Sequence, residues 1–94
     1  MSTVADIGVA SWGNLFVCKL PEKVRLAFAE CLHNLTTKRR RLEVRAKLIA
    51  RCVIDEKLQR VFADNDWEAI ARKPDTELAK VFKAACEINL IPTN

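Results

Sequence analysis

The residues of this chain that could perform chemistry are four cysteines, one histidine and twelve acidic residues. The cysteines are Cys18, Cys31, Cys52 and Cys86. A zinc site needs closely spaced ligand pairs, and no two of the four form a Cys-x-x-Cys pair. The nearest candidate, Cys31 followed by His33, stands alone. The pattern is typical of reduced thiols in the core of a cytosolic protein, so we expect no metal ion and no other cofactor.

The acidic residues do not form a recognisable catalytic or calcium-binding motif. The chain has no Tyr, no Gly-rich phosphate loop and no Gly-x-Ser-x-Gly motif. The acids at 55–56 and 64–66 lack the ligand spacing and the central Gly of a calcium loop, so we interpret them as turn and capping residues. Catalysis requires a convergent set of acid, base or nucleophilic groups. We therefore expect a protein that is not an enzyme.

A basic cluster is the strongest charge feature of the chain. Residues 38–47 hold six cations and one acid, and Arg39, Arg40, Arg41 and Arg45 are its arginines. Three interpretations stay open: a solvated helix face, a surface for an acidic protein, and phosphate contacts with nucleic acid. Nucleic acid is the least favoured, because the cluster lacks interleaved aromatic residues and a base-reading second helix.

The net charge of +4 is distributed unevenly along the chain. Residues 19–51 contain ten Lys and Arg against three acids, whereas residues 52–94 contain six Lys and Arg against eight acids. Opposite charges on the two halves can attract copies of the chain to one another, or attract the basic half to an acidic partner. This distribution would therefore allow copies of the chain to associate.

The elements that position these residues are predicted to be mostly helical. Ninety-four residues with only two Gly and three Pro make one domain, of mainly α fold class with about four helices. Residues 15–20 and 58–62 could add a short β-hairpin. Residues 1–13 show no sustained period and are predicted as a flexible N-terminal arm, before a single helical domain over 14–94. Trp12 in the arm is expected to dock on the body or on a neighbouring chain. No apolar run is long enough to span a membrane.

Apolar periodicity places the helices. Val24, Phe28 and Leu32 mark a stripe after Pro21, and a second helix is predicted from Lys38 to Ile54. Asp64 is predicted to cap a short third helix, and the last helix should start near Asp75, after Pro74. The predicted inward face of that last helix consists of Leu78, Val81, Phe82, Ala85 and Cys86.

The order of short motifs over residues 15–90 resembles the tail assembly chaperones of long non-contractile-tailed bacteriophages and prophages. The motifs are Val17-Cys18-Lys19-Leu20-Pro21-Glu22-Lys23, Val53-Ile54-Asp55-Glu56, Phe62, Asp64-Asn65-Asp66 and Ile88-Asn89-Leu90. One position departs from the pattern, because Leu58 stands where many relatives have Gly. A positive φ is costly for leucine, so we expect the turn there to be reshaped.

The resemblance implies a small, non-enzymatic assembly factor that forms a homo-oligomer. Such a protein would bind the tape measure protein, help to recruit the tail tube protein, act in the cytoplasm of the infected or lysogenic bacterial host, and be absent from the mature virion. We expect its partner surface to use some of the aromatic residues, with the basic cluster selecting acidic stretches of the partner. Those aromatic residues are Trp12, Phe16, Phe28 and Trp67. Two alternatives stay open: a small basic nucleic-acid-binding regulator from a phage or mobile element, and a structural subunit of the virion.

Overall fold

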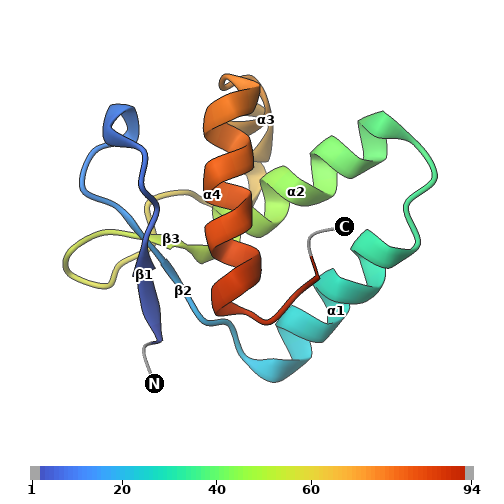
Figure 1. The fold of residues 1–94 in the computed structure, drawn as a ribbon, viewed down its shortest axis with the longest axis horizontal. Helices are drawn as coiled ribbons and strands as arrows, with labels where there is room; N and C mark the ends of the chain where they lie inside the picture. The colour runs from blue at the N-terminus through green and yellow to red at the C-terminus, as the bar shows by residue number, and fades with distance from the viewer. Residues whose placement is uncertain (1–2, 93–94) are drawn as a thin grey trace.

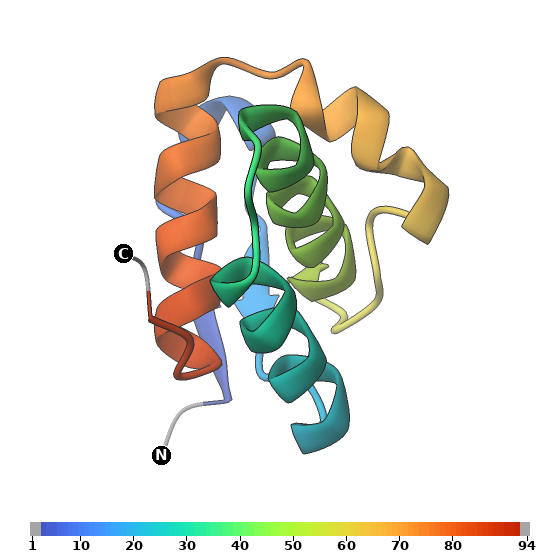
Figure 2. The ribbon, with the colours of Figure 1, turned by 90° about the vertical axis from the view of Figure 1, so that its right-hand side faces the viewer.

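The computed structural model describes residues 3–92, which form four helices and a three-stranded antiparallel sheet, so the mainly α fold class is confirmed. The elements are β1 (Val4–Asp6), the 3-10 turn η1 (Ala10–Trp12), β2 (Phe16–Cys18), α1 (Glu22–His33), α2 (Lys38–Cys52), β3 (Val53–Ile54), the 3-10 turn η2 (Asp64–Asp66), α3 (Trp67–Ala71) and α4 (Asp75–Ile88). The sheet lies on one side of α4 in Figure 1, with α1 and α2 on the other side. In Figure 2, α2 lies between α3 and α4.

The N-terminal segment belongs to the domain, so the prediction of a flexible arm is wrong for the part of it that the structure describes. β1 pairs antiparallel with β2, with Val4 opposite Cys18 and Asp6 opposite Phe16. Ile7 and Val9, which follow β1, are buried in the core. The sequence of this segment shows no alternation of apolar and polar residues because the strand is only three residues long. Residues 1–2 lie outside the described part.

The predicted hairpin between residues 15–20 and 58–62 is also wrong in its pairing. β2 is the central strand, and its second neighbour is β3, with Val17 opposite Val53. The second helix therefore ends at Cys52, two residues earlier than predicted. Val53 and Ile54 are β-branched residues that suit an extended backbone. Residues near 60 form only a bridge, from Arg60 to Ile54.

The turn after β3 has a left-handed backbone at Leu58, which is the conformation that a glycine would adopt most easily. Leu58 has a φ of 64°, so the expectation of a reshaped turn is wrong. Asp55 holds the turn, because its Oδ1 accepts hydrogen bonds from the backbone N–H groups of Lys57 at 2.8 Å and Gln59 at 3.0 Å. The Asp55 N–H also donates to the Gln59 carbonyl at 2.9 Å. Local hydrogen bonds thus offset the backbone strain at Leu58.

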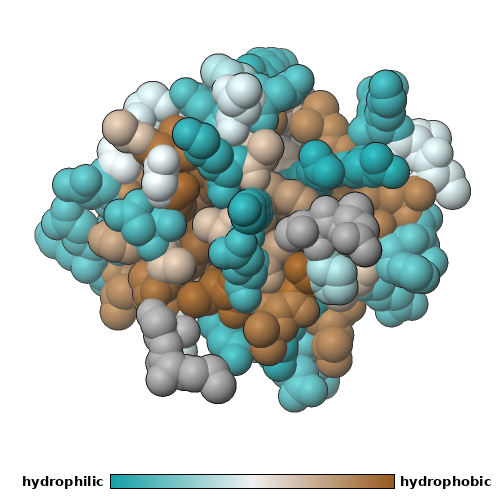
Figure 3. Space-filling view, viewed as in Figure 1, coloured by the Kyte–Doolittle hydropathy of each residue, from teal (hydrophilic) through white to brown (hydrophobic). Residues whose placement is uncertain are grey.

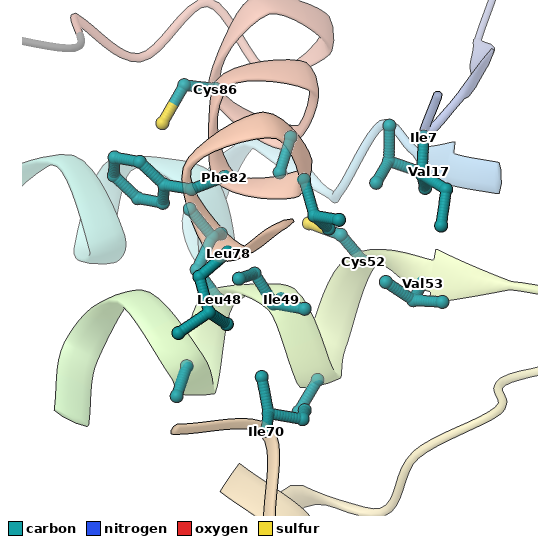
Figure 4. Close-up of a cluster of buried hydrophobic side chains, with 14 of the residues drawn as sticks. Ile7, Val17, Leu48, Ile49, Cys52, Val53, Ile70, Leu78, Phe82 and Cys86 are labelled. Carbon is teal, nitrogen blue, oxygen red and sulfur yellow. The ribbon is translucent and has the colours of Figure 1, made fainter. Parts of the chain in front are cut away.

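The core lies between α2, α4 and the sheet, with α3 closing the far side of α2 (Figure 4). The predicted inward face of α4 is confirmed, since its buried residues are Leu78, Val81, Phe82, Ala85 and Cys86. From α2, the fully buried Leu48 and Ile49 enter the same core. Val17 of β2 and Val53 of β3 complete it from the sheet.

One polar side chain sits in this core. Asn89, directly after α4, is 1% exposed. Its Oδ1 accepts a hydrogen bond from the Leu20 N–H at 2.6 Å, and its Nδ2 donates to the carbonyls of Ala85 at 2.9 Å and Cys18 at 3.2 Å. A buried amide needs such partners. Asn89 thereby joins the end of α4 to the chain between β2 and α1.

α1 is less covered than its apolar stripe predicted. None of its residues is fully buried, although Val24, Phe28 and Leu32 pack against the core with part of their surface. Leu26 on its outer side is 57% exposed. Figure 1 shows why: α1 extends away from the sheet and packs mainly beneath α2. The stripe is therefore shared between the core and the surface.

The short third helix begins differently from the prediction. Asp64 is the first residue of η2 rather than a cap, and Ala63 precedes it. The capping carboxylate belongs to Asp66, whose Oδ2 accepts the Ala63 N–H at 2.8 Å. Asp64 instead pairs with Arg60 at 2.7 Å and with Arg51 at 3.6 Å.

Candidate partner-binding site

A groove of about 440 Å³ runs between α2 and the N-terminal half of α4. It is lined from α2 by Lys38, Arg41, Leu42, Arg45, Ala46 and Ile49, and from α4 by Asp75, Leu78 and Ala79. On the face viewed in Figure 1, hydrophobic residues reach the surface in patches between hydrophilic ones (Figure 3). Apolar surface next to polar groups is what a binding groove offers to a partner.

The floor of the groove is apolar. Ala46, Ile49 and Leu78 are buried and belong to the core cluster, so the bottom of the groove is part of the rigid body of the domain. Leu42 is 39% exposed and stands higher on the same side of α2. Its side chain is therefore available to a partner without any rearrangement of the core.

The rim on the α2 side is cationic. Lys38, Arg41 and Arg45 all line the groove, and their spacing of three and four residues places them on one edge of the helix. The Arg45 guanidinium lies over the Phe82 ring, 4.7 Å from its centroid, which fixes the side chain against α4. Its buried Nε has no hydrogen-bond partner among residues 3–92. Arg45 thus contributes a fixed positive charge to the rim, beside the exposed Lys38 and Arg41.

The four predicted arginines do not act as one group. Arg41 and Arg45 line the groove, whereas Arg39 and Arg40 do not. Arg40 forms an ion pair with Glu43, and Lys47 pairs with the same carboxylate at 3.0 Å. The hydrogen bond from Lys47 is the main cause that lowers the pKa of Glu43. Arg40 is thus engaged with its own helix.

The first turn of α2 concentrates positive charge where a helix least favours it. Thr37 caps the helix, with its Oγ1 accepting the Arg40 N–H at 3.2 Å. No acidic residue follows in that turn, although the positive end of the helix dipole favours acids there by about 0.3–1 kcal/mol each. Lys38 occupies the first helical position instead. The cations in this turn oppose the helix dipole, and the fold does not compensate for them. Their position therefore points to a role in binding a partner.

Trp12 docks on its own domain, which is one of the two alternatives predicted from the sequence. Its indole Nε1 donates a hydrogen bond to Glu77 at 3.0 Å, and its ring makes an edge contact with Phe62 at 6.1 Å between centroids. The Lys73 ammonium lies 4.8 Å from the centroid of the Trp12 ring. Most of the bonding capacity of Trp12 is therefore used within the chain.

The other predicted aromatic residues lie on separate elements. Trp67 on α3 has the Lys47 ammonium 5.5 Å from its ring centroid. Phe16 lies on the central strand opposite Ile54, and Phe28 lies on α1 beside a shallow hollow. Among residues 3–92, no ring contact joins any two of Trp12 and these three. The four aromatic residues therefore do not form one continuous surface.

The prediction that the cysteines are core residues is confirmed for Cys52 and Cys86 but is wrong for Cys31, which is exposed, while Cys18 is only partly buried. All four cysteines are free, and Cys52 and Cys86 are buried. Burial raises the pKa of Cys52 to about 12 and that of Cys86 to about 11, which keeps both protonated at neutral pH. Within the described residues, no group of three or more His, Cys, Asp or Glu side chains could hold a metal ion.

Sequence reasoning did not select several residues of the groove. Lys38 belonged to the predicted basic cluster, but Leu42, Asp75 and Ala79 were not predicted to contact a partner. The helical spacing of Lys38, Arg41 and Arg45 could have shown the cationic edge. The α4 side could not be found in this way, because it depends on how the two helices cross.

The chain matches no known protein family, no curated protein and no solved structure. None of the described helices is both long enough and apolar enough to cross a lipid bilayer.

Proposed function

We propose that this protein is a non-enzymatic tail assembly chaperone of a long non-contractile-tailed bacteriophage or prophage. It binds the tape measure protein, keeps the apolar helical segments of that protein soluble, and helps to recruit the tail tube protein. It acts as a homo-oligomer in the cytoplasm of the bacterial host and is absent from the mature virion. The order of short motifs along the chain, from Val17 to Leu90, supports this assignment.

The groove between α2 and α4 is the observation that carries the proposal. A chaperone for helical segments has to cover an apolar stripe and release it later. The floor of the groove, with Leu42 at its exposed edge, offers apolar contact. The cationic rim keeps the edge of the empty groove hydrated.

Co-expression with the tape measure protein of the same phage tests the proposal. The expected result is a soluble complex with several copies of this chain per tape measure protein, measured by pull-down and light scattering. Leu42→Asp should reduce the recovery of the complex, because it places a charge at the exposed edge of the apolar floor. Leu26→Asp is the matched control, since Leu26 is equally apolar, 57% exposed and on α1. An insoluble tape measure protein beside free wild-type chain would refute the function.

A small basic regulator that binds nucleic acid is the second candidate. Arg39 and Arg41 are exposed, and neither forms an ion pair among residues 3–92. Such cations suit phosphate contacts. A gel shift at low salt tests this candidate, because binding through phosphates falls steeply as the salt concentration rises. The absence of a shifted band at low salt would remove it.

A further inference from the structure

We propose that the groove between α2 and α4 selects an amphipathic helix whose flank on the α2 side carries acidic residues. The identity of the bound protein rests on the proposed function, but the chemistry of the bound segment follows from the groove itself. The segment would lay an apolar stripe on the floor and direct its carboxylates toward Lys38, Arg41 and Arg45.

The spacing of the rim matches the spacing of a helical partner. From Lys38 to Arg45 the rim advances seven residues along α2, which is about 10 Å at 1.5 Å per residue. Acidic residues at i, i+3 or i+4, and i+7 of a bound helix cover the same length on one face. Three carboxylates can therefore face three cations when the two helices lie alongside each other.

The backbone adds to the positive field at one end of the groove. Lys38 is the first residue of α2, Asp75 is the first residue of α4, and both line the groove. Figure 2 shows the two helices beginning at the same end of the molecule. The N-terminal ends of both helix dipoles thus lie at this end and favour an anionic ligand over a cationic one.

The two sides of the groove differ in charge. The α2 side has three cations, whereas the α4 side contributes only the carboxylate of Asp75 to the lining. An acidic flank turned toward α4 would meet that carboxylate, while the same flank turned toward α2 meets only cations. The groove therefore specifies which flank of the partner helix is acidic, and a basic flank on the α2 side is rejected.

Designed helical peptides provide the test. One peptide carries a Leu and Ala stripe with three Glu on one flank, and the matched peptide carries Lys in their place. Fluorescence anisotropy at low and at physiological salt measures their affinities for the wild-type protein. The expected result is that the Glu peptide binds and the Lys peptide does not, with an affinity for the Glu peptide that falls as salt rises.

The chain offers a matched pair of variants for the same assay. Arg41→Glu reverses a charge on the rim and should weaken the Glu peptide roughly fivefold or more. Arg39→Glu makes the same change two residues away, outside the groove lining, and should leave the affinity within about twofold. Circular dichroism melting of both variants checks that the fold is kept. Equal weakening by the two variants would overturn the proposal, as would equal binding of the two peptides.

Other outcomes separate this proposal from the proposed function. If the peptides follow the predicted charge dependence but the tape measure protein stays insoluble, the groove assignment stands and the chaperone assignment falls. If Arg41→Glu and the wild type solubilise the tape measure protein equally well, the chaperone assignment stands and the groove assignment falls. If no peptide binds and Arg41→Glu instead dissociates oligomers in light scattering, a second copy fills the groove and the proposal is wrong.

Discussion

The indole Nε1 of Trp12 donates a hydrogen bond to the carboxylate of Glu77 at 3.0 Å, across 65 residues of sequence. The Ser11 hydroxyl donates to the other oxygen of the same carboxylate at 2.6 Å. Glu77 lies in the first turn of α4, where a negative charge is favoured by the helix dipole. One carboxylate thus secures η1 against the start of α4.

This contact predicts a pH dependence. The hydrogen bonds from Ser11 and then from Trp12 are the main causes that lower the pKa of Glu77 below its ordinary value of 4.5. A folded-state pKa below the unfolded value means that the stabilisation is present above about pH 4.5 and is lost as the pH falls through the folded value. The Trp12 indole N–H signal in an NMR titration should therefore shift only below pH 4.5. The Trp67 signal is the internal control and should not follow the same curve.

Glu77→Gln should remove this acid-dependent change, since the amide does not titrate. Unfolding by urea at pH 7 and at pH 3.5 measures the effect. The difference in stability between the two pH values should be smaller in the variant than in the wild type. An identical difference in both proteins would show that the Trp12 contact does not depend on the charge of Glu77.

Asn89 should be among the polar side chains whose loss costs most. Asn89→Ala removes the side-chain hydrogen bonds to Leu20, Cys18 and Ala85 and leaves the buried Leu20 N–H without the partner it has in the wild type. We expect a loss of about 2–4 kcal/mol in the free energy of unfolding, since each unsatisfied buried group costs about 1–3 kcal/mol. Chemical denaturation measures it. Asn65→Ala, at an exposed position in η2, should stay within about 0.5 kcal/mol. A loss for Asn89→Ala as small as that for Asn65→Ala would mean that water takes over the hydrogen bonds of the Asn89 amide.

The two leucines with positive φ should be replaceable with a gain in stability. Leu58 has a φ of 64° and Leu90 a φ of 58°, and they are 68% and 72% exposed. Leu90 follows α4 in a Schellman turn, in which the Ile91 N–H donates to the Cys86 carbonyl at 2.9 Å and the Leu90 N–H to the Glu87 carbonyl at 3.3 Å. Glycine usually occupies this position. Leu58→Gly and Leu90→Gly should each stabilise the fold by about 0.5–1 kcal/mol, because strain is removed and little burial is lost.

Leu26→Gly is the control for this pair. Leu26 is 57% exposed but lies within α1, so glycine there should destabilise the fold by about 1 kcal/mol. Thermal melting of the three variants compares the signs directly. Destabilisation by all three would mean that Leu58 and Leu90 make apolar contacts in solution, for example between copies of the chain.

The charge at the two ends of α2 should affect stability in opposite directions. Lys38→Glu places an acid at the first position of α2 and should stabilise the fold by about 0.5 kcal/mol at low salt. The same variant should bind the acidic peptide more weakly, because Lys38 lines the groove. Arg51→Glu, in the last turn, should destabilise the fold by about 0.5–1.5 kcal/mol, since it opposes the dipole and loses the pair with Asp64. If Lys38→Glu lowered the melting temperature, the cationic first turn would be serving the fold rather than a partner.

Local signals in the sequence predicted the helices well where they were strong. Pro74 and the spacing from Leu78 to Cys86 are enough to place α4 and its buried face, because each depends only on neighbours within the helix. The sheet was not predictable in the same way. β3 is two residues long and continues the apolar period of α2. Its extended backbone follows from pairing with β2, where Val17 lies opposite Val53, 36 residues away in the sequence.

The candidate site was predictable only in part. The cationic edge of α2 can be read from the spacing of Lys38, Arg41 and Arg45. The aromatic residues could not be assigned to a surface from sequence, because Trp12 finds Glu77 and Phe62 only through the tertiary fold. An exposed Trp and an internally docked Trp have the same sequence signature.

The hydrogen bond between Leu20 and Asn89 also sets the order in which the chain folds during translation. The hairpin of β1 and β2 and the first helices can form while the rest of the chain is still being translated. The domain cannot close until Asn89 has left the exit tunnel, because that residue joins the far end of α4 to the chain after β2. Until then the side of β2 that α4 covers stays uncovered. The nascent chain therefore leaves this apolar surface uncovered until its C-terminal residues have been made.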